Sequence, residues 1–263
     1  MNNREQWIFP GMPVLSLLRA QPGSISVLER FGVDPWLEPH AQLETICAAK
    51  GITWGDLEIE LKSISTRRID SDWDGLSLPM LLNHLVLDHA DILDSMLPAI
   101  RMALTRASGR GIAPGRLAYI ATAWPAFTAD LAAHMQEEEV FLFPRLLQYD
   151  HCVRHGGRHP DFNAGSVKVF IALRMLGNEH KQMDALKKFL SDWRAIPQSG
   201  AVESDAERSL HDLLEEFQKR LETHSRIEET VLFPRGTALE KMLYDRAISG
   251  SASVMLPVTA STR

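Results

Sequence analysis

The sequence predicts an all-α protein, with an up-down-up-down four-helix bundle preceded by a small helical domain. Apolar residues recur at spacings of three and four, and β-branched runs are short. Long periodic segments alternate with loops that carry glycine and proline, which stop helices. A chain of 263 residues, 45% of them apolar, is long enough to bury a substantial core.

The domain boundaries follow from the turn signals. Residues 1–68 are expected to form the small N-terminal domain, whose short helices are broken at QPGS, GVDPWLEPH and KGITWGD. The polar joint STRRIDSDWDG leads to a bundle over residues 75–236. Its helices are expected at about 77–106, 115–143, 164–193 and 203–233, and residues 237–263 are expected to form a C-terminal tail.

Composition narrows the classes of function. A net charge of -6 argues against a general attraction to nucleic acid or to an anionic membrane. The chain shows no secretory signal pattern and no run of 18 apolar residues, so we expect a cytoplasmic protein. Cys47 and Cys152 lie far apart and form no paired thiolate motif.

Two segments repeat the same chemistry 90 residues apart. HMQEEEVFLFPR begins at His134 and HSRIEETVLFPR begins at His224, and each carries a glutamate four residues after its histidine. Glu138 and Glu228 therefore continue the apolar stripe of their helices, on the face expected to be buried. The other two stripes are each interrupted by one histidine, His89 and His180. Intervals of 45, 46 and 44 residues allow the four histidines to lie at one height.

Helical geometry also indicates which neighbours stand apart from this set. A residue five positions along an α-helix points about 140° away, which places His84 and Glu139 off the stripe. The histidines His151, His155 and His159 either bind a metal or belong to a solvated loop, and the glycines around them favour the loop.

Buried carboxylates and imidazoles require a partner, because an unpaired buried charge costs several kcal/mol. A bound cation is one explanation, and the alternative is that each polar residue is satisfied separately in the core. The shared stripe favours a metal. Nitrogen and oxygen ligands suit iron, manganese or zinc, and bundle cores commonly hold dinuclear sites. The predicted ligands are His89, His134, Glu138, His180, His224 and Glu228.

These motifs resemble the hemerythrin-like, HHE cation-binding family. Within it, the chain is most similar to the di-iron proteins of iron-sulfur cluster repair, also called regulators of cell morphogenesis and nitric oxide signalling. The segments SISVLERFGVD and QLETICAAKGI are similar to that family's N-terminal domain. The resemblance implies two iron ions joined by an oxo or hydroxo bridge. It also implies that the four histidines are terminal ligands and that Glu138 and Glu228 are bridges.

The sequence departs from the pattern of these relatives at three places. Trp36 and Leu37 stand where the repair proteins have a Cys-Cys pair, and Asp88 stands where a tyrosine precedes the first-helix histidine. Asp184 occupies the position of a fifth histidine in blood-type hemerythrins, which disfavours reversible oxygen carriage. The N-terminal domain is therefore expected to dock, through Trp36, against the bundle or against a second chain in a homodimer.

The expected function is nitrosative or oxidative stress response, by binding or reducing nitric oxide or by assisting repair of iron-sulfur proteins. An alternative is a di-iron sensor or store for dioxygen or nitric oxide that does not turn over. A metal-free helical interaction module is the third interpretation.

Overall fold

The computed structural model describes residues 8–64, 72–108, 116–156 and 205–252, and it confirms the predicted all-α class. The described residues form helices joined by turns, and an isolated β-bridge links Pro13 and Gln42. The expected third bundle helix, with His180 and Asp184, lies outside the described residues, as does His159.

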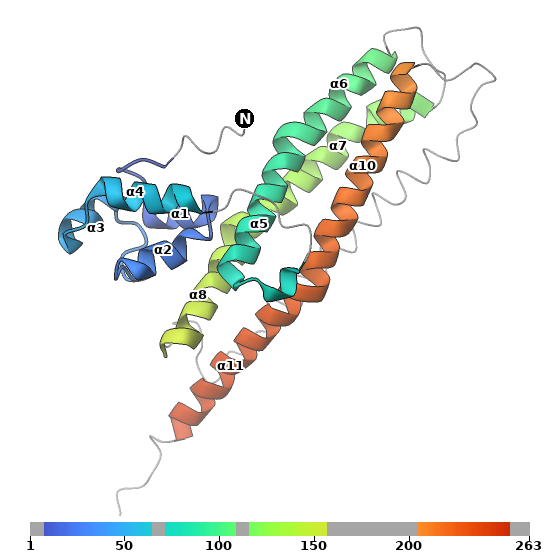
Figure 1. The fold of residues 1–263 in the computed structure, drawn as a ribbon. Coiled ribbons are helices and arrows are strands. Elements are labelled where there is room, and N and C mark those ends of the chain that lie inside the picture. The colour runs from blue at the N-terminus through green and yellow to red at the C-terminus, as the bar shows by residue number, and fades with distance from the viewer. Residues whose placement is uncertain (1–7, 65–71, 109–115, 157–204, 253–263) are drawn as a thin grey trace, which may run out of the picture.

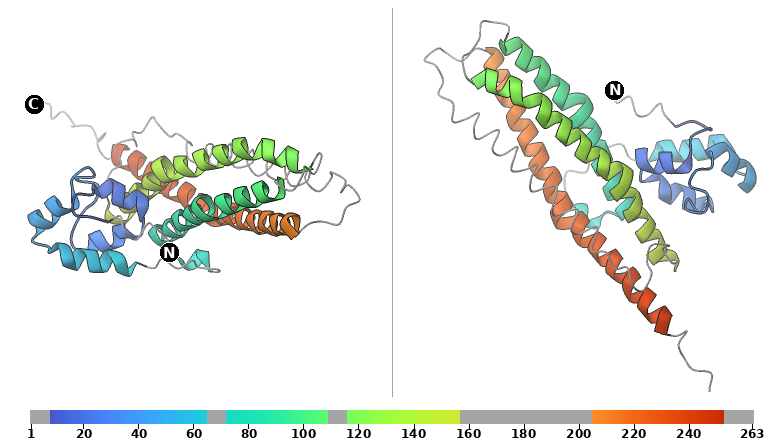
Figure 2. Two further views of the ribbon diagram at one scale, coloured as in Figure 1. Left: turned by 90° about the horizontal axis from the view of Figure 1, so that it is seen from above. Right: turned by 180° about the vertical axis from the view of Figure 1, so that it is seen from behind.

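The N-terminal domain is built from four short helices. They are α1 (Val14–Ala20), α2 (Ser24–Arg30), α3 (Leu43–Lys50) and α4 (Trp54–Ser63). Each end has a local cause. Gly51 takes the left-handed conformation that ends α3, and the Thr53 side chain accepts a hydrogen bond from the Asp56 amide at the start of α4. These helices pack beside one end of the bundle (Figures 1 and 2).

Three long helical rods of the bundle are described, and each is interrupted by one π-helical turn. The first rod comprises α5 (Leu78–Asp91), a π turn (Ile92–Met96) and α6 (Leu97–Ser108). The second rod comprises α7 (Arg116–Glu137), a π turn (Glu138–Leu142) and α8 (Phe143–His155). The last rod comprises α10 (Asp205–Ile227), a π turn (Glu228–Leu232) and α11 (Phe233–Ala252). A short 3-10 turn (Trp73–Gly75) precedes α5. The first rod runs antiparallel to the other two (Figure 1), as an up-down-up-down bundle requires.

The π turns explain how each rod passes through one of its prolines. Pro98, Pro144 and Pro234 each lie two residues after such a turn, and the residue before each proline donates its N–H to a carbonyl five positions back. A proline has no N–H and its ring crowds the preceding turn of an α-helix. The wider π turn absorbs this crowding, so the helix continues.

Two helices therefore extend beyond their expected ends. The second rod was expected to stop at residue 143, but α8 continues to His155, where Gly156 ends it in the left-handed conformation. His151 and His155 thus lie on a helix. The sequence had suggested a loop for these residues, and that prediction was wrong. The last rod continues past the boundary expected at Gly236 and reaches Ala252.

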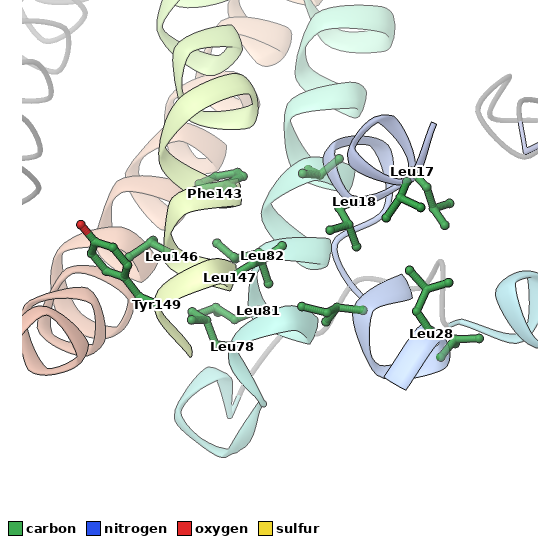
Figure 3. Close-up of a cluster of buried hydrophobic side chains, with 14 of the residues drawn as sticks. Leu17, Leu18, Leu28, Leu78, Leu81, Leu82, Phe143, Leu146, Leu147 and Tyr149 are labelled. Carbon is green, nitrogen blue, oxygen red and sulfur yellow. The ribbon is translucent and has the colours of Figure 1, made fainter. Parts of the chain in front are cut away.

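Two apolar clusters form the interior. The upper cluster joins α6, α7 and α10 through residues such as Ile100, Trp124 and Phe217. The lower cluster joins the N-terminal helices to α5, α8 and α11. Figure 3 shows Leu17, Leu18 and Leu28 of the N-terminal domain beside the leucines of α5 and α8 that belong to the same cluster. The N-terminal domain and the bundle consequently share one hydrophobic core.

Candidate metal centre

A polar layer separates the two apolar clusters. His89 on α5, His224 on α10, and Glu138 and Glu228 at the starts of two π turns are all buried, with at most 5% of each residue exposed. One side-chain nitrogen or oxygen from each of these four residues lies within 4.8 Å of the others. Three helices that are distant in sequence therefore bring two imidazoles and two carboxylates to one point.

The ring nitrogens of the two histidines face each other. Nε2 of His89 lies 3.3 Å from Nε2 of His224, 3.4 Å from a carboxylate oxygen of Glu138, and Nε2 of His224 lies 3.0 Å from Glu228. His134, one turn before Glu138, places its Nε2 3.2 Å from the other Glu138 oxygen. Of the six predicted ligands, the structure brings these five together, and His180 lies outside the described residues.

The opposite nitrogen of each ring contacts a carboxylate. Nδ1 of His224 is 3.1 Å from Asp88, and Nδ1 of His89 is 3.1 Å from Glu139. Carboxylates accept hydrogen bonds, so with a metal bound an N–H at Nδ1 would face Asp88 or Glu139 and the Nε2 lone pair would be left for the ion. Histidine ligands of metals are typically oriented in this way by a carboxylate.

Sequence reasoning missed both of these carboxylates. Glu139 was expected off the stripe and stands outside the four-residue cluster, but its carboxylate still reaches Nδ1 of His89. Glu139 is partly buried, and its side chain spans the gap to α5. Asp88 differs from the tyrosine of the related proteins, but no contact with His224 was predicted for it. The repeated Leu-Phe-Pro-Arg inside a long helix was the available signal for the π turn.

Arg220 supports Asp88 from α10. Its guanidinium forms a close ion pair with Asp88 Oδ1, while Oδ2 faces His224. The outer side of this pair lines a pocket of 360 Å³ that also includes Trp73, His84 and Arg226. His84, expected off the stripe, is buried at this pocket and is not part of the four-residue cluster.

When protons are the only positive charges available, burial and the neighbouring charges have opposing effects on the pKa values of the cluster. Burial and the charge of Glu228 raise the pKa of the Glu138 carboxyl, although His89 and His134 oppose the change. Burial lowers the pKa of His224, but Glu228 and Asp88 outweigh it and raise that pKa well above its usual range. The carboxylates repel each other, and protons relieve this repulsion either by neutralising a carboxyl or by charging a buried imidazole.

A cation relieves this conflict and fits the residues present. Glu138 Oε2 is buried and has no hydrogen-bond partner within the part of the chain that the structure describes. The donors are imidazole nitrogens and carboxylate oxygens, a set that suits iron, manganese or zinc. Since metal binding displaces protons from its ligands, a divalent ion would replace the shared protons with a stronger positive charge. This buried histidine and glutamate group could therefore hold a metal.

Comparison with known proteins agrees with this class of helical metal-site protein. No protein-family model matches the chain. The iron-sulfur cluster repair protein YtfE of Enterobacter sp. (strain 638) is 22% identical over 236 residues, which are 88% of this chain and 99% of that protein. YtfE proteins of Escherichia coli O1:K1 / APEC and of Escherichia fergusonii are each 20% identical over 237 residues, covering 87% of this chain and 97% of theirs.

The chain is thus similar over most of its length, at 20–22% identity, to proteins named for iron-sulfur cluster repair, as its motifs predicted. Across the described parts of the chain, each helix is too short or too polar to cross a membrane.

Proposed function

We propose that this is a cytoplasmic di-iron protein of the nitrosative or oxidative stress response, which binds or reduces nitric oxide, assists repair of iron-sulfur proteins, or does both. The observation that carries the proposal is the buried convergence of His89, Glu138, His224 and Glu228. The similarity to proteins named for iron-sulfur cluster repair also supports a role in such repair.

The residues that would hold iron are His89, His134, Glu138, His180, His224 and Glu228. A bound iron pair would supply electrons and open coordination positions for a diatomic ligand. The protein's part is to present the imidazole Nε2 atoms, to keep bulk water out with the apolar clusters on either side, and to fix the rings through Asp88 and Glu139.

The burial of both cysteines supports the view that any chemistry takes place in the bundle and not at a thiol. The chain has two cysteines, Cys47 and Cys152, and both are buried. Burial raises the pKa of each thiol, with Asp34 adding to the effect at Cys152, so neither is a ready nucleophile. Trp36 packs against the lower cluster, whereas Leu37 is 79% exposed. We infer that the N-terminal domain acts by docking.

The first test is metal analysis of protein purified anaerobically without added iron. We expect about two iron ions per chain, the stoichiometry of a dinuclear bundle site. Zinc in place of iron, with one tightly held zinc ion per chain and no iron, would contradict the di-iron proposal. A chain that binds no metal would instead support the metal-free interaction module.

Anaerobic titration with nitric oxide then separates turnover from binding. A reductase with a supplied electron donor must release nitrous oxide in more than one equivalent per site. A single saturable binding event without nitrous oxide would support the alternative, a non-catalytic sensor or store for nitric oxide or dioxygen.

A further inference from the structure

A second group of metal-binding side chains lies where the N-terminal domain meets the bundle. It consists of Glu29 on α2 with His151 and His155 on α8. Glu29 Oε1 is 3.2 Å from Nδ1 of His151 and 3.5 Å from Nε2 of His155, and the two imidazole rings lie 4.5 Å apart. The two histidines are one helical turn apart, so they present their rings on the same face.

The distances suit a small tetrahedral ion. Two bonds of about 2.0–2.1 Å at a tetrahedral angle hold their ligand atoms about 3.3–3.4 Å apart. The contacts of 3.2 and 3.5 Å around Glu29 Oε1 bracket that spacing. The His155 side chain is 52% exposed, so solvent reaches the group and can supply a fourth ligand.

Neighbouring charges already orient two of the three ligands. Arg154 donates to both oxygens of Glu29 and is itself held by Asp150 at 2.7 Å. Asp34 lies 3.4 Å from Nε2 of His151, the nitrogen that faces away from Glu29. A carboxylate on the far nitrogen of a histidine is the usual second contact of a zinc ligand.

Glu29 is also in the protonation state that a metal requires. Although burial, the largest influence, raises the pKa of Glu29, hydrogen bonds from Arg154 and His151 outweigh it and hold that pKa below its usual range. A metal ion would take the place of the histidine proton and of the Arg154 Nη2 contact at Oε1, while Arg154 keeps its bonds to Glu29 Oε2 and Asp150. Cys152, beside His151 in sequence, is buried and absent from the group.

We propose that Glu29, His151 and His155 form a mononuclear site for a zinc-like divalent cation, which links the N-terminal domain to α8 and is separate from the buried centre. The site joins α2 to α8, so its occupancy would favour the docked arrangement of the domain. The proposal is independent of which metal occupies the buried centre.

The test is a zinc titration of the full-length, iron-loaded protein, with zinc and iron measured together. We expect one more zinc equivalent in the unaltered protein than in His155→Gln, and at least a tenfold weaker affinity in His155→Gln and Glu29→Gln. The iron content should stay the same in all of them. His211→Gln is the matched control, because His211 also faces a glutamate one turn away, Glu215, without a third ligand in the group.

Cobalt and thermal unfolding provide two further measurements. Cobalt(II) in the site should give the visible absorption of a tetrahedral complex, which His155→Gln should lose. Zinc should raise the unfolding temperature of the unaltered protein and of His211→Gln, but not of His155→Gln. Equal zinc binding by the unaltered protein and His155→Gln would overturn the proposal. So would a failure of zinc to bind beyond the buried centre, which would leave the group as an ion-pair network alone.

Discussion

At the scale of single residues, Glu138 and Glu228 bear the main electrostatic cost of the buried centre. Two carboxylates converge in a place where water cannot screen them, and a cation between them turns their repulsion into attraction. The same two residues begin the π turns that carry the second and last rods past their prolines. A metal held by Glu138 and Glu228 would therefore act on the residues that begin these two π turns.

Glu138→Ala and Glu228→Ala are each expected to lose most of the bound metal, measured by elemental analysis after desalting. Removal of either carboxylate leaves the imidazoles without the charge that balances a cation. Glu229→Ala is the control, because Glu229 is exposed one residue further along. Glu139→Ala is unsuitable as a control, since Glu139 contacts His89. Equal metal loss in Glu229→Ala would contradict the assignment of the buried face.

Asp88→Asn should weaken metal binding without removing a ligand. An asparagine keeps the shape of Asp88 but loses the charge that pairs with Arg220 and orients His224. Loss of such a carboxylate typically lowers metal affinity on the order of 10–100-fold. Competition with a chelator would measure the change. Asp94→Asn, at an exposed position on the same rod, should retain the unaltered affinity.

At the scale of helices, the repeated Leu-Phe-Pro-Arg segments have different partners. Arg235 donates to the carbonyls of Trp73, Asp74 and Leu76, and so anchors the segment that precedes α5. Arg145, its counterpart on α8, lies near Glu240 of α11 and lowers the pKa of that carboxyl. Burial has the larger effect, so the net pKa of Glu240 is raised.

Glu240→Gln is therefore expected to stabilise the protein at neutral and higher pH. A raised pKa means that the folded chain binds the proton more tightly than the unfolded chain, so this group's contribution to the free energy of unfolding falls as pH rises. Urea unfolding at about pH 8 and at about pH 4, near the ordinary pKa of a glutamate, should show a gain that shrinks at the lower pH. Glu222→Gln, on the exposed face of α10, should show no such gain.

Periodicity predicted much of these helices from sequence, and its failures have a physical cause. Leu214, Phe217, Leu221 and His224 fall on one face because each spacing is three or four, and the structure buries all four. The same rule did not show that the Glu139 side chain would reach Nδ1 of His89. It also ended the second rod too early, because a proline was taken to stop a helix that in fact passes through it.

At the scale of the whole molecule, the two expected domains share a core. The lower cluster contains Leu17 and Leu28 of the N-terminal domain together with Leu82 and Leu147 of the bundle. The sequence predicted where the N-terminal domain lies along the chain, since turn residues mark its limits. It could not predict how much apolar surface the two parts bury together, because hydrophobic contact between distant segments has no signature in local spacing.

A chain that begins near Asp70 tests what the N-terminal domain contributes. The helices that carry the buried centre remain, so we expect this shorter chain to keep its iron. Leu78, Leu81 and Leu82 on α5 would lose part of their apolar surroundings, and exposed patches of this kind promote association. Light scattering during gel filtration should therefore show that the shorter chain self-associates more than the full chain.

The possible outcomes of this truncation distinguish three roles of the N-terminal domain. Self-association with unchanged iron content would support a domain that docks on the bundle and covers its apolar side. A dimeric full chain and a monomeric shorter chain would instead place a homodimer contact in the N-terminal domain, where Leu37 is largely exposed. Loss of iron from a shorter chain that stays folded would contradict docking as the domain's sole role, because the domain would then be needed to hold the buried centre together.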